Sequence, residues 1–105
     1  MVFNRNLSQP AATLPDVHSD AILQYLTTRQ HLRPHLAVID VLDQTTERFG
    51  CCPLAIRRAL QWLGIDGNRR IGRMRRSELV QLARAVHRFW MQNAAAAAEQ
   101  IAPQV

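Results

Sequence analysis

The residues best suited to metal or thiol chemistry are four histidines and two adjacent cysteines, Cys51 and Cys52. Zinc ligands are usually separated by about two to four residues, whereas these cysteines are direct neighbours. His31 and His35 flank Pro34, which we expect to break any helical face that they would share. We therefore expect no metal site and no cofactor, with Cys51 buried and Cys52 a weak helix cap. A thiol redox switch at Cys52 is the alternative.

The sequence contains no pattern typical of an active site. Paired carboxylates, a glycine-rich phosphate loop and a nucleophile elbow are all missing from it. The eight acidic residues are sparse, and most of them lie in the N-terminal half. We therefore expect that the protein is not an enzyme.

Arginine is the most informative residue type, because all thirteen basic residues are arginines. Residues 1–47 carry a net charge of −2, whereas residues 48–88 carry +8 within a total of +5. This asymmetry is typical of a nucleic-acid-binding half joined to a neutral packing half. An acidic protein partner is the alternative for such a charged face. The absence of lysine and the abundance of alanine favour a GC-rich bacterial or phage coding sequence.

The stretch that must position these arginines is residues 42–63, which we predict to be two helices joined at Gly50. Leu42, Thr45, Thr46 and Phe49 recur at helical spacing before the glycine. Glycine enters a left-handed conformation without the steric cost that a Cβ imposes, so Gly50 can end the first helix. Cys52-Pro53 then starts the second helix with proline at its first position. A second apolar stripe follows, formed by Leu54, Ala55, Ile56, Ala59, Leu60 and Leu63.

Residues 42–63 resemble the helix-turn-helix of bacterial and phage DNA-binding regulators, in particular segments of the form LAERFGVSxATVRRAL. The pattern matches at Glu47, Arg48, Phe49, Gly50, Ala55, Ile56, Arg57, Arg58, Ala59 and Leu60. It differs at Thr46, Cys51 and Cys52, where alanine, valine and a capping serine or threonine are usual. The resemblance covers about a fifth of the chain and implies binding to double-stranded DNA.

In a helix-turn-helix, the outer face of the second helix enters the major groove. At 100° per residue, Arg57 and Gln61 share one line, with Arg58 beside it. Arginine can bond guanine and glutamine can bond adenine, while Pro53 and Leu54 could contact thymine methyl groups. The following loop contains five arginines in eight residues, which suit phosphate oxygens. The predicted phosphate contacts are Arg48, Arg69, Arg70, Arg73, Arg75 and Arg76.

Helices on both sides of this motif, and an extension of its first helix, complete the predicted fold. Ser19 or Asp20 could cap a helix from Asp20 to about Gln30. Pro34 could start the next one, which we expect to run without a break to Phe49. Ser77-Glu78 opens a last helix with a strong apolar stripe, which either closes the core or forms a dimer seam. The candidate seam residues are Leu82, Val86, Phe89 and Trp90. Trp62 is expected to pack against this last helix.

The sequence therefore predicts an all-α bundle of four to five helices with a central helix-turn-helix. We expect a flexible arm at 1–18, a single helical DNA-binding domain at 19–92 and an alanine-rich tail at 93–105 that extends the last helix. No membrane span or signal peptide is apparent, so we expect a cytoplasmic protein. The expected function is sequence-specific binding of double-stranded DNA by a homodimer, in transcriptional regulation.

Two alternatives remain open. One is a helical protein–protein interaction module, such as an adaptor or an anti-sigma-like or secretion-associated protein, whose arginine face docks on an acidic protein. The other is an RNA-binding protein that uses the arginine-rich loop and prefers single strands or hairpins. The chain lacks the several exposed aromatic residues that base stacking would use, which favours duplex DNA over RNA.

Overall fold

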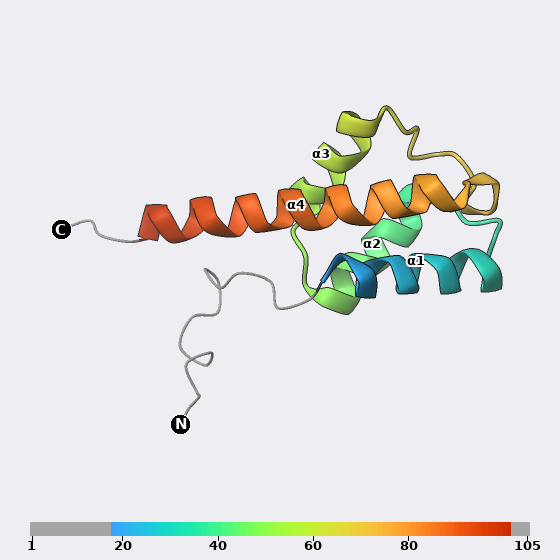
Figure 1. The fold of residues 1–105 in the computed structure, drawn as a ribbon, viewed down its shortest axis with the longest axis horizontal. Helices are drawn as coiled ribbons and strands as arrows, with labels where there is room; N and C mark the ends of the chain where they lie inside the picture. Colours follow the sequence, from blue (N-terminus) through green and yellow to red (C-terminus); the bar gives the residue numbers. More distant parts are fainter. Residues whose placement is uncertain (1–17, 102–105) are drawn as a thin grey trace, which may run out of the picture.

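The computed structural model describes residues 18–101, with side chains described to residue 96, and this part of the chain is all-α. Its helices are α1 (Ser19–Leu32), α2 (Val38–Phe49), α3 (Pro53–Leu63) and α4 (Arg76–Ile101), with a short 3₁₀ turn, η2 (Ile71–Arg73), before α4. Figure 1 shows α4 as the long axis of the molecule, with α1 along one side and α3 on the other. The predicted arm lies almost wholly outside the described residues, as does the end of the predicted tail.

The first helix forms close to its predicted position. It starts one residue earlier than expected, with His18 as the N-cap, and no side chain caps it. Ile22 and Leu26 are fully buried and hold α1 against the core. Burial of these two branched side chains on one stripe explains why a helix of modest amphipathicity is stable here.

The prediction that the second helix begins at Pro34 is wrong. Residues 34–37 precede α2 and run beside residues 69–72. The Val38 N–H donates to Arg69 O at 2.8 Å, the Ile71 N–H to Leu36 O at 2.8 Å and the Gly72 N–H to Pro34 O at 3.0 Å. These bonds hold residues 34–37 outside the helix, so α2 starts at Val38. From there α2 continues unbroken to Phe49, as predicted.

The turn between α2 and α3 has the predicted conformation. Gly50 adopts a left-handed φ of 78°, and its N–H donates to Thr46 O at 2.8 Å. Pro53 occupies the first turn of α3, and Gly64 ends that helix with φ of 66°. Cys52 stands at the N-cap, but its side chain makes no capping hydrogen bond, so its predicted role as a weak cap is wrong.

The last helix closes the core and extends into the tail, as predicted. Leu79, Leu82, Ala83, Val86 and Trp90 are buried against α1 and α3. Three of the four candidate seam residues, Leu82, Val86 and Trp90, are therefore already covered by their own chain. They are unavailable to a partner, and the prediction of a dimer seam at these positions is wrong. No helix within residues 18–101 is both long enough and apolar enough to cross a membrane.

The arginine-rich connection from α3 to α4 is a loop pinned at several points rather than a hairpin. Asp66 Oδ1 accepts the Asn68 N–H at 2.9 Å and forms a tight turn. Ile71 and Met74 are buried in the core. The Gln30 amide of α1 donates to both Ile71 O and Met74 O at 2.9 Å. These contacts fix the backbone from which the loop arginines project.

Candidate nucleic-acid interface

The residues predicted to read bases lie together on the outer side of α3. Pro53, Arg57, Arg58 and Gln61 are exposed, and Leu54 is 44 % exposed. The opposite side of the helix is buried and consists of Ala55, Ile56, Ala59 and Leu60. The 100° step of an α-helix separates these two faces, and the two left-handed glycines fix where the helix begins and ends. The structure thus places five predicted residues on one accessible face.

The two arginines of this face lie apart from every carboxylate whose side chain the structure describes. Within residues 18–96, neither Arg57 nor Arg58 has a carboxylate oxygen within 4.0 Å of its guanidinium. The segment that forms α3 contains no acidic residue. Both guanidinium groups therefore keep their paired N–H donors for an external acceptor with two oxygens or with a ring nitrogen and an oxygen.

Arg48 lies at the end of α2, next to the turn that leads into α3. Its guanidinium carbon is 5.4 Å from the centre of the Phe49 ring, and Phe49 meets Tyr25 edge-on at 5.7 Å. These contacts restrict the Arg48 side chain while leaving it exposed. Its charge is therefore held beside α1, where Gln24 and Tyr25 line the same surface depression.

Arg69 has a structural role that the sequence pattern did not indicate. Its guanidinium forms a two-pronged ion pair with Glu78, with Nη1–Oε2 at 2.9 Å and Nη2–Oε1 at 3.0 Å, and also donates to Arg73 O. The hydrogen bond from Arg69 lowers the pKa of Glu78, and the backbone N–H of Arg75 adds to this effect. The Glu78 carboxylate thus neutralises the Arg69 charge and occupies its terminal N–H donors, so Arg69 is not suited to bind a phosphate group.

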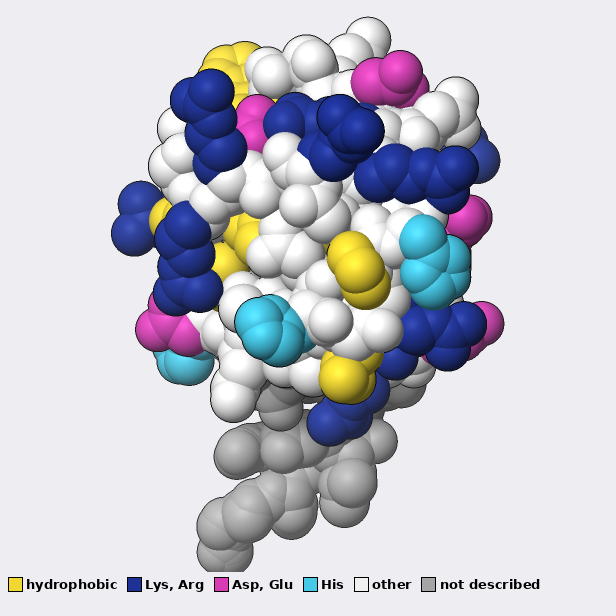
Figure 2. Space-filling model, turned by 90° about the vertical axis from the view of Figure 1, so that its right-hand side faces the viewer, with side chains coloured by type: hydrophobic (Ala, Val, Ile, Leu, Met, Phe, Trp, Pro, Cys, Tyr) yellow, Lys and Arg dark blue, Asp and Glu magenta, His cyan; other side chains and the backbone are white. Residues whose placement is uncertain are grey.

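The other loop arginines remain on the surface. Arg73 and Arg75 are exposed, and Arg70 is exposed while it donates one hydrogen bond to His35 O. Figure 2 views the end of the molecule where this loop lies and shows arginine side chains gathered across its upper half. Acidic side chains lie singly on that face, some of them beside the arginines and others toward its edges (Figure 2). The loop therefore presents a concentrated positive charge.

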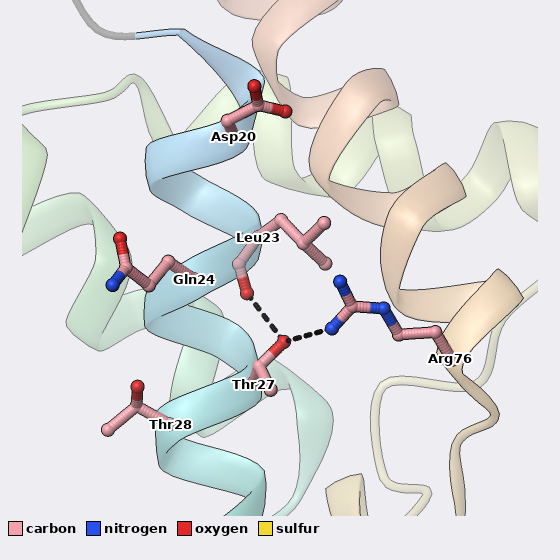
Figure 3. A pocket seen from close by; sticks show the side chains of 6 residues that line it. All are labelled: Asp20, Leu23, Gln24, Thr27, Thr28 and Arg76. Carbon is pink, nitrogen blue, oxygen red and sulfur yellow. Dashed lines mark hydrogen bonds between the residues drawn. The ribbon is translucent and has the colours of Figure 1, made fainter.

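Arg76, at the start of α4, is tied to α1. Its Nη1 donates to Thr27 Oγ1 at 3.3 Å, and the Thr27 hydroxyl donates in turn to Leu23 O at 2.8 Å. Figure 3 shows this arginine reaching over a surface depression of about 330 Å³ between the two helices. Asp20, Gln24 and Thr28 line the rest of the depression. The contact orients Arg76 and occupies one of its terminal nitrogens.

The two cysteines lie in different environments, and Cys51 is buried as predicted. Cys51 is 1 % exposed, and burial raises the pKa of its thiol, although the Thr46 hydroxyl 3.9 Å away partly opposes this. Cys52 is only half-buried. No three histidine, cysteine or carboxylate side chains in the described part of the chain gather as a metal site would require.

Trp62 packs against α4 as predicted, yet most of the residue stays exposed. It does meet α4, where its ring contacts Phe89 edge-on at 6.2 Å, but it remains 67 % exposed. Arg88 of α4 lies with its guanidinium carbon 5.9 Å from the Trp62 ring centre. The helical step gives the reason, because Trp62 falls at the border between the buried and the outer face of α3.

No protein-family model, curated protein or solved structure matches this chain. Its function is therefore inferred from the geometry of α2, α3 and the arginine-rich loop.

Proposed function

We propose that this protein binds double-stranded DNA sequence-specifically, with α2, the Gly50 turn and α3 as its helix-turn-helix, and that it regulates transcription in the cytoplasm. The observation that carries the proposal is the outer face of α3. Arg57, Arg58 and Gln61 are exposed there, on a helix whose other side is anchored in the core, and no carboxylate among residues 18–96 pairs with either arginine. An α-helix with such a face fits the width of the major groove.

Within this proposal the residues of α3 read the bases. Arg57 and Arg58 each offer two parallel N–H donors to guanine O6 and N7, and Gln61 offers a donor and an acceptor to adenine. Leu54 and Pro53 stand at the start of the helix, where base contacts usually concentrate, and suit thymine methyl groups. Each good two-pronged contact discriminates against the wrong base by about 1–3 kcal/mol.

The phosphate contacts in this proposal are Arg48 beside the turn and Arg70, Arg73, Arg75 and Arg76 from the loop and the start of α4. Arg69 is left out because Glu78 already neutralises it. Such contacts raise affinity for every duplex and make it depend on salt.

A homodimer would let two α3 helices read two half-sites about one helical turn apart. Because Leu82, Val86 and Trp90 are buried in their own chain, the contact between copies would have to use other surfaces.

The test is fluorescence anisotropy with labelled random-sequence and selected duplexes at two salt concentrations. Arg57→Ala is expected to weaken binding to the selected duplex by about 1–3 kcal/mol and to relax the preference at one base pair. Arg75→Ala is expected to weaken all duplexes alike and to reduce the salt slope by about 1. Arg33→Ala, at an exposed position after α1, serves as the matched control. Unchanged affinity of both α3 and loop variants for every duplex would refute the proposal.

A further inference from the structure

A groove between α3 and α4 is not explained by DNA binding. Its apolar part is formed by Trp62 and Leu63 of α3 and by Ala85 and Phe89 of α4, while Gln81, Arg84 and Arg88 form the rim along α4. Its volume is about 210 Å³, which is below the roughly 300–1,000 Å³ of small-molecule sites. The groove therefore suits one inserted side chain rather than a whole small ligand.

Trp62 is the unusual feature of this groove. This residue is 67 % exposed, although a large aromatic side chain gains much by burial. Tryptophan and arginine together are the residue types most enriched at the energetic centres of protein interfaces. Here Arg88 lies over the Trp62 ring and Phe89 supports its edge, so the aromatic side chain is held in place before any partner arrives.

The groove is positively charged, which favours an acidic partner. The lining residues include two arginines and no carboxylate. In the sequence, neither α3 nor α4 between Glu78 and Glu99 contains an acidic residue. Within the described side chains, no carboxylate lies within 4.0 Å of the guanidinium of Arg84 or Arg88. A second copy of this chain would bring like charges together, which disfavours self-association through this face.

We infer that the Trp62 groove is a docking site for an acidic amphipathic segment of a partner protein, which inserts one apolar side chain beside Trp62 and pairs its carboxylates with Arg84 and Arg88. Duplex DNA fits less well, because its phosphates supply charge but no side chain to fill an apolar groove. Trp62 lies beside Arg58, one helical turn before it, but about 100° or more from Arg57 and Gln61 around α3, so Arg57→Ala tests the DNA surface separately from the groove.

The test uses the whole chain and labelled synthetic peptides about 16 residues long, with leucine or phenylalanine at helical i, i+3, i+4 and i+7 positions and glutamate elsewhere. At least one peptide is expected to bind with salt-dependent affinity and to shield Trp62 emission from acrylamide, since Trp90 is already buried. Trp62→Ala and Arg88→Glu should each weaken binding about tenfold or more. Arg33→Glu, the matched charge reversal away from the groove, and Arg57→Ala should change it less than about twofold.

Three results would overturn the inference. One is that no peptide of the panel binds to a protein shown by circular dichroism to be folded. Another is that Trp62→Ala and Arg88→Glu weaken the binding of duplex DNA but not the binding of peptide, which would show that the groove belongs to the DNA-binding surface. The third is self-association that Trp62→Ala abolishes, which would assign it to a second copy. Because Arg57→Ala is expected to weaken DNA binding but not peptide binding, this inference and the proposed DNA binding can fail independently.

Discussion

Gly72→Ala is expected to destabilise the protein more than any other glycine-to-alanine change at a turn. An alanine Cβ at this position would lie 2.7 Å from Pro34 Cβ and 2.9 Å from Pro34 O. These atoms belong to the ring and backbone of a neighbouring segment, so no flexible side chain can move aside. The clash forces residues 34–37 away from residues 69–72.

The expected cost follows from the contacts between these segments. Separation weakens the Gly72 N–H bond to Pro34 O at 3.0 Å and the Ile71 N–H bond to Leu36 O at 2.8 Å. At about 0.5–1.5 kcal/mol each, two such bonds amount to about 1–3 kcal/mol. Disturbed packing of the fully buried Ile71 adds on the order of 1 kcal/mol. The total is roughly 2–4 kcal/mol, which would lower Tm by roughly 8–32 °C at about 4–8 °C per kcal/mol.

Gly50→Ala is the control, because its added Cβ would meet nothing within 4 Å. Its expected cost is only the left-handed backbone conformation, about 1–2 kcal/mol. The measurement is thermal and urea unfolding followed by circular dichroism at 222 nm, the wavelength of helical signal. If Gly72→Ala proves no more destabilising than Gly50→Ala, the pairing of residues 34–37 with residues 69–72 does not contribute to stability.

Three further outcomes are expected. The hydrogen bond from Arg69 lowers the pKa of Glu78 below its usual 4.5. The ion pair therefore stabilises the folded protein at pH values above 4.5. This stabilisation is lost as the pH falls through the lower pKa that Glu78 has in the folded protein. Glu78→Gln should therefore lower Tm at neutral pH, and the difference from wild type should shrink in acid. Cys51, buried and with a raised pKa, should stay unmodified by a thiol reagent in the folded protein, while half-buried Cys52 reacts first, as mass spectrometry of C51A and C52A would check. Leu82→Ala should lower the free energy of unfolding in urea by about 2–5 kcal/mol, because Leu82 is fully buried in the core. The sedimentation coefficient of the protein should not change. A change in self-association without a loss of stability would instead show that Leu82 lies in a dimer interface.

Local sequence was sufficient for the centre of the fold. Gly50 is left-handed, Pro53 lies in the first turn of α3, and the stripe from Leu79 to Trp90 faces the core, all as predicted. Each of these features is decided within one or two helical turns, by backbone sterics or by the spacing of apolar residues. The exposure of Arg57, Arg58 and Gln61 follows from the same spacing, since burying Ile56 and Leu60 turns these side chains outward.

Tertiary structure alone decided where α2 begins, which arginine is neutralised and which apolar residues stay exposed. Residues 34–37 leave the helix because they bond to a segment more than thirty positions away, and nothing near Pro34 signals that pairing. Arg69 meets Glu78 only once the loop has been folded back by Ile71, Met74 and Gln30. Trp62 remains exposed because α4 covers only one edge of its ring. Spacing along one helix reports which side chains share a face, whereas the partner of that face depends on how distant elements pack.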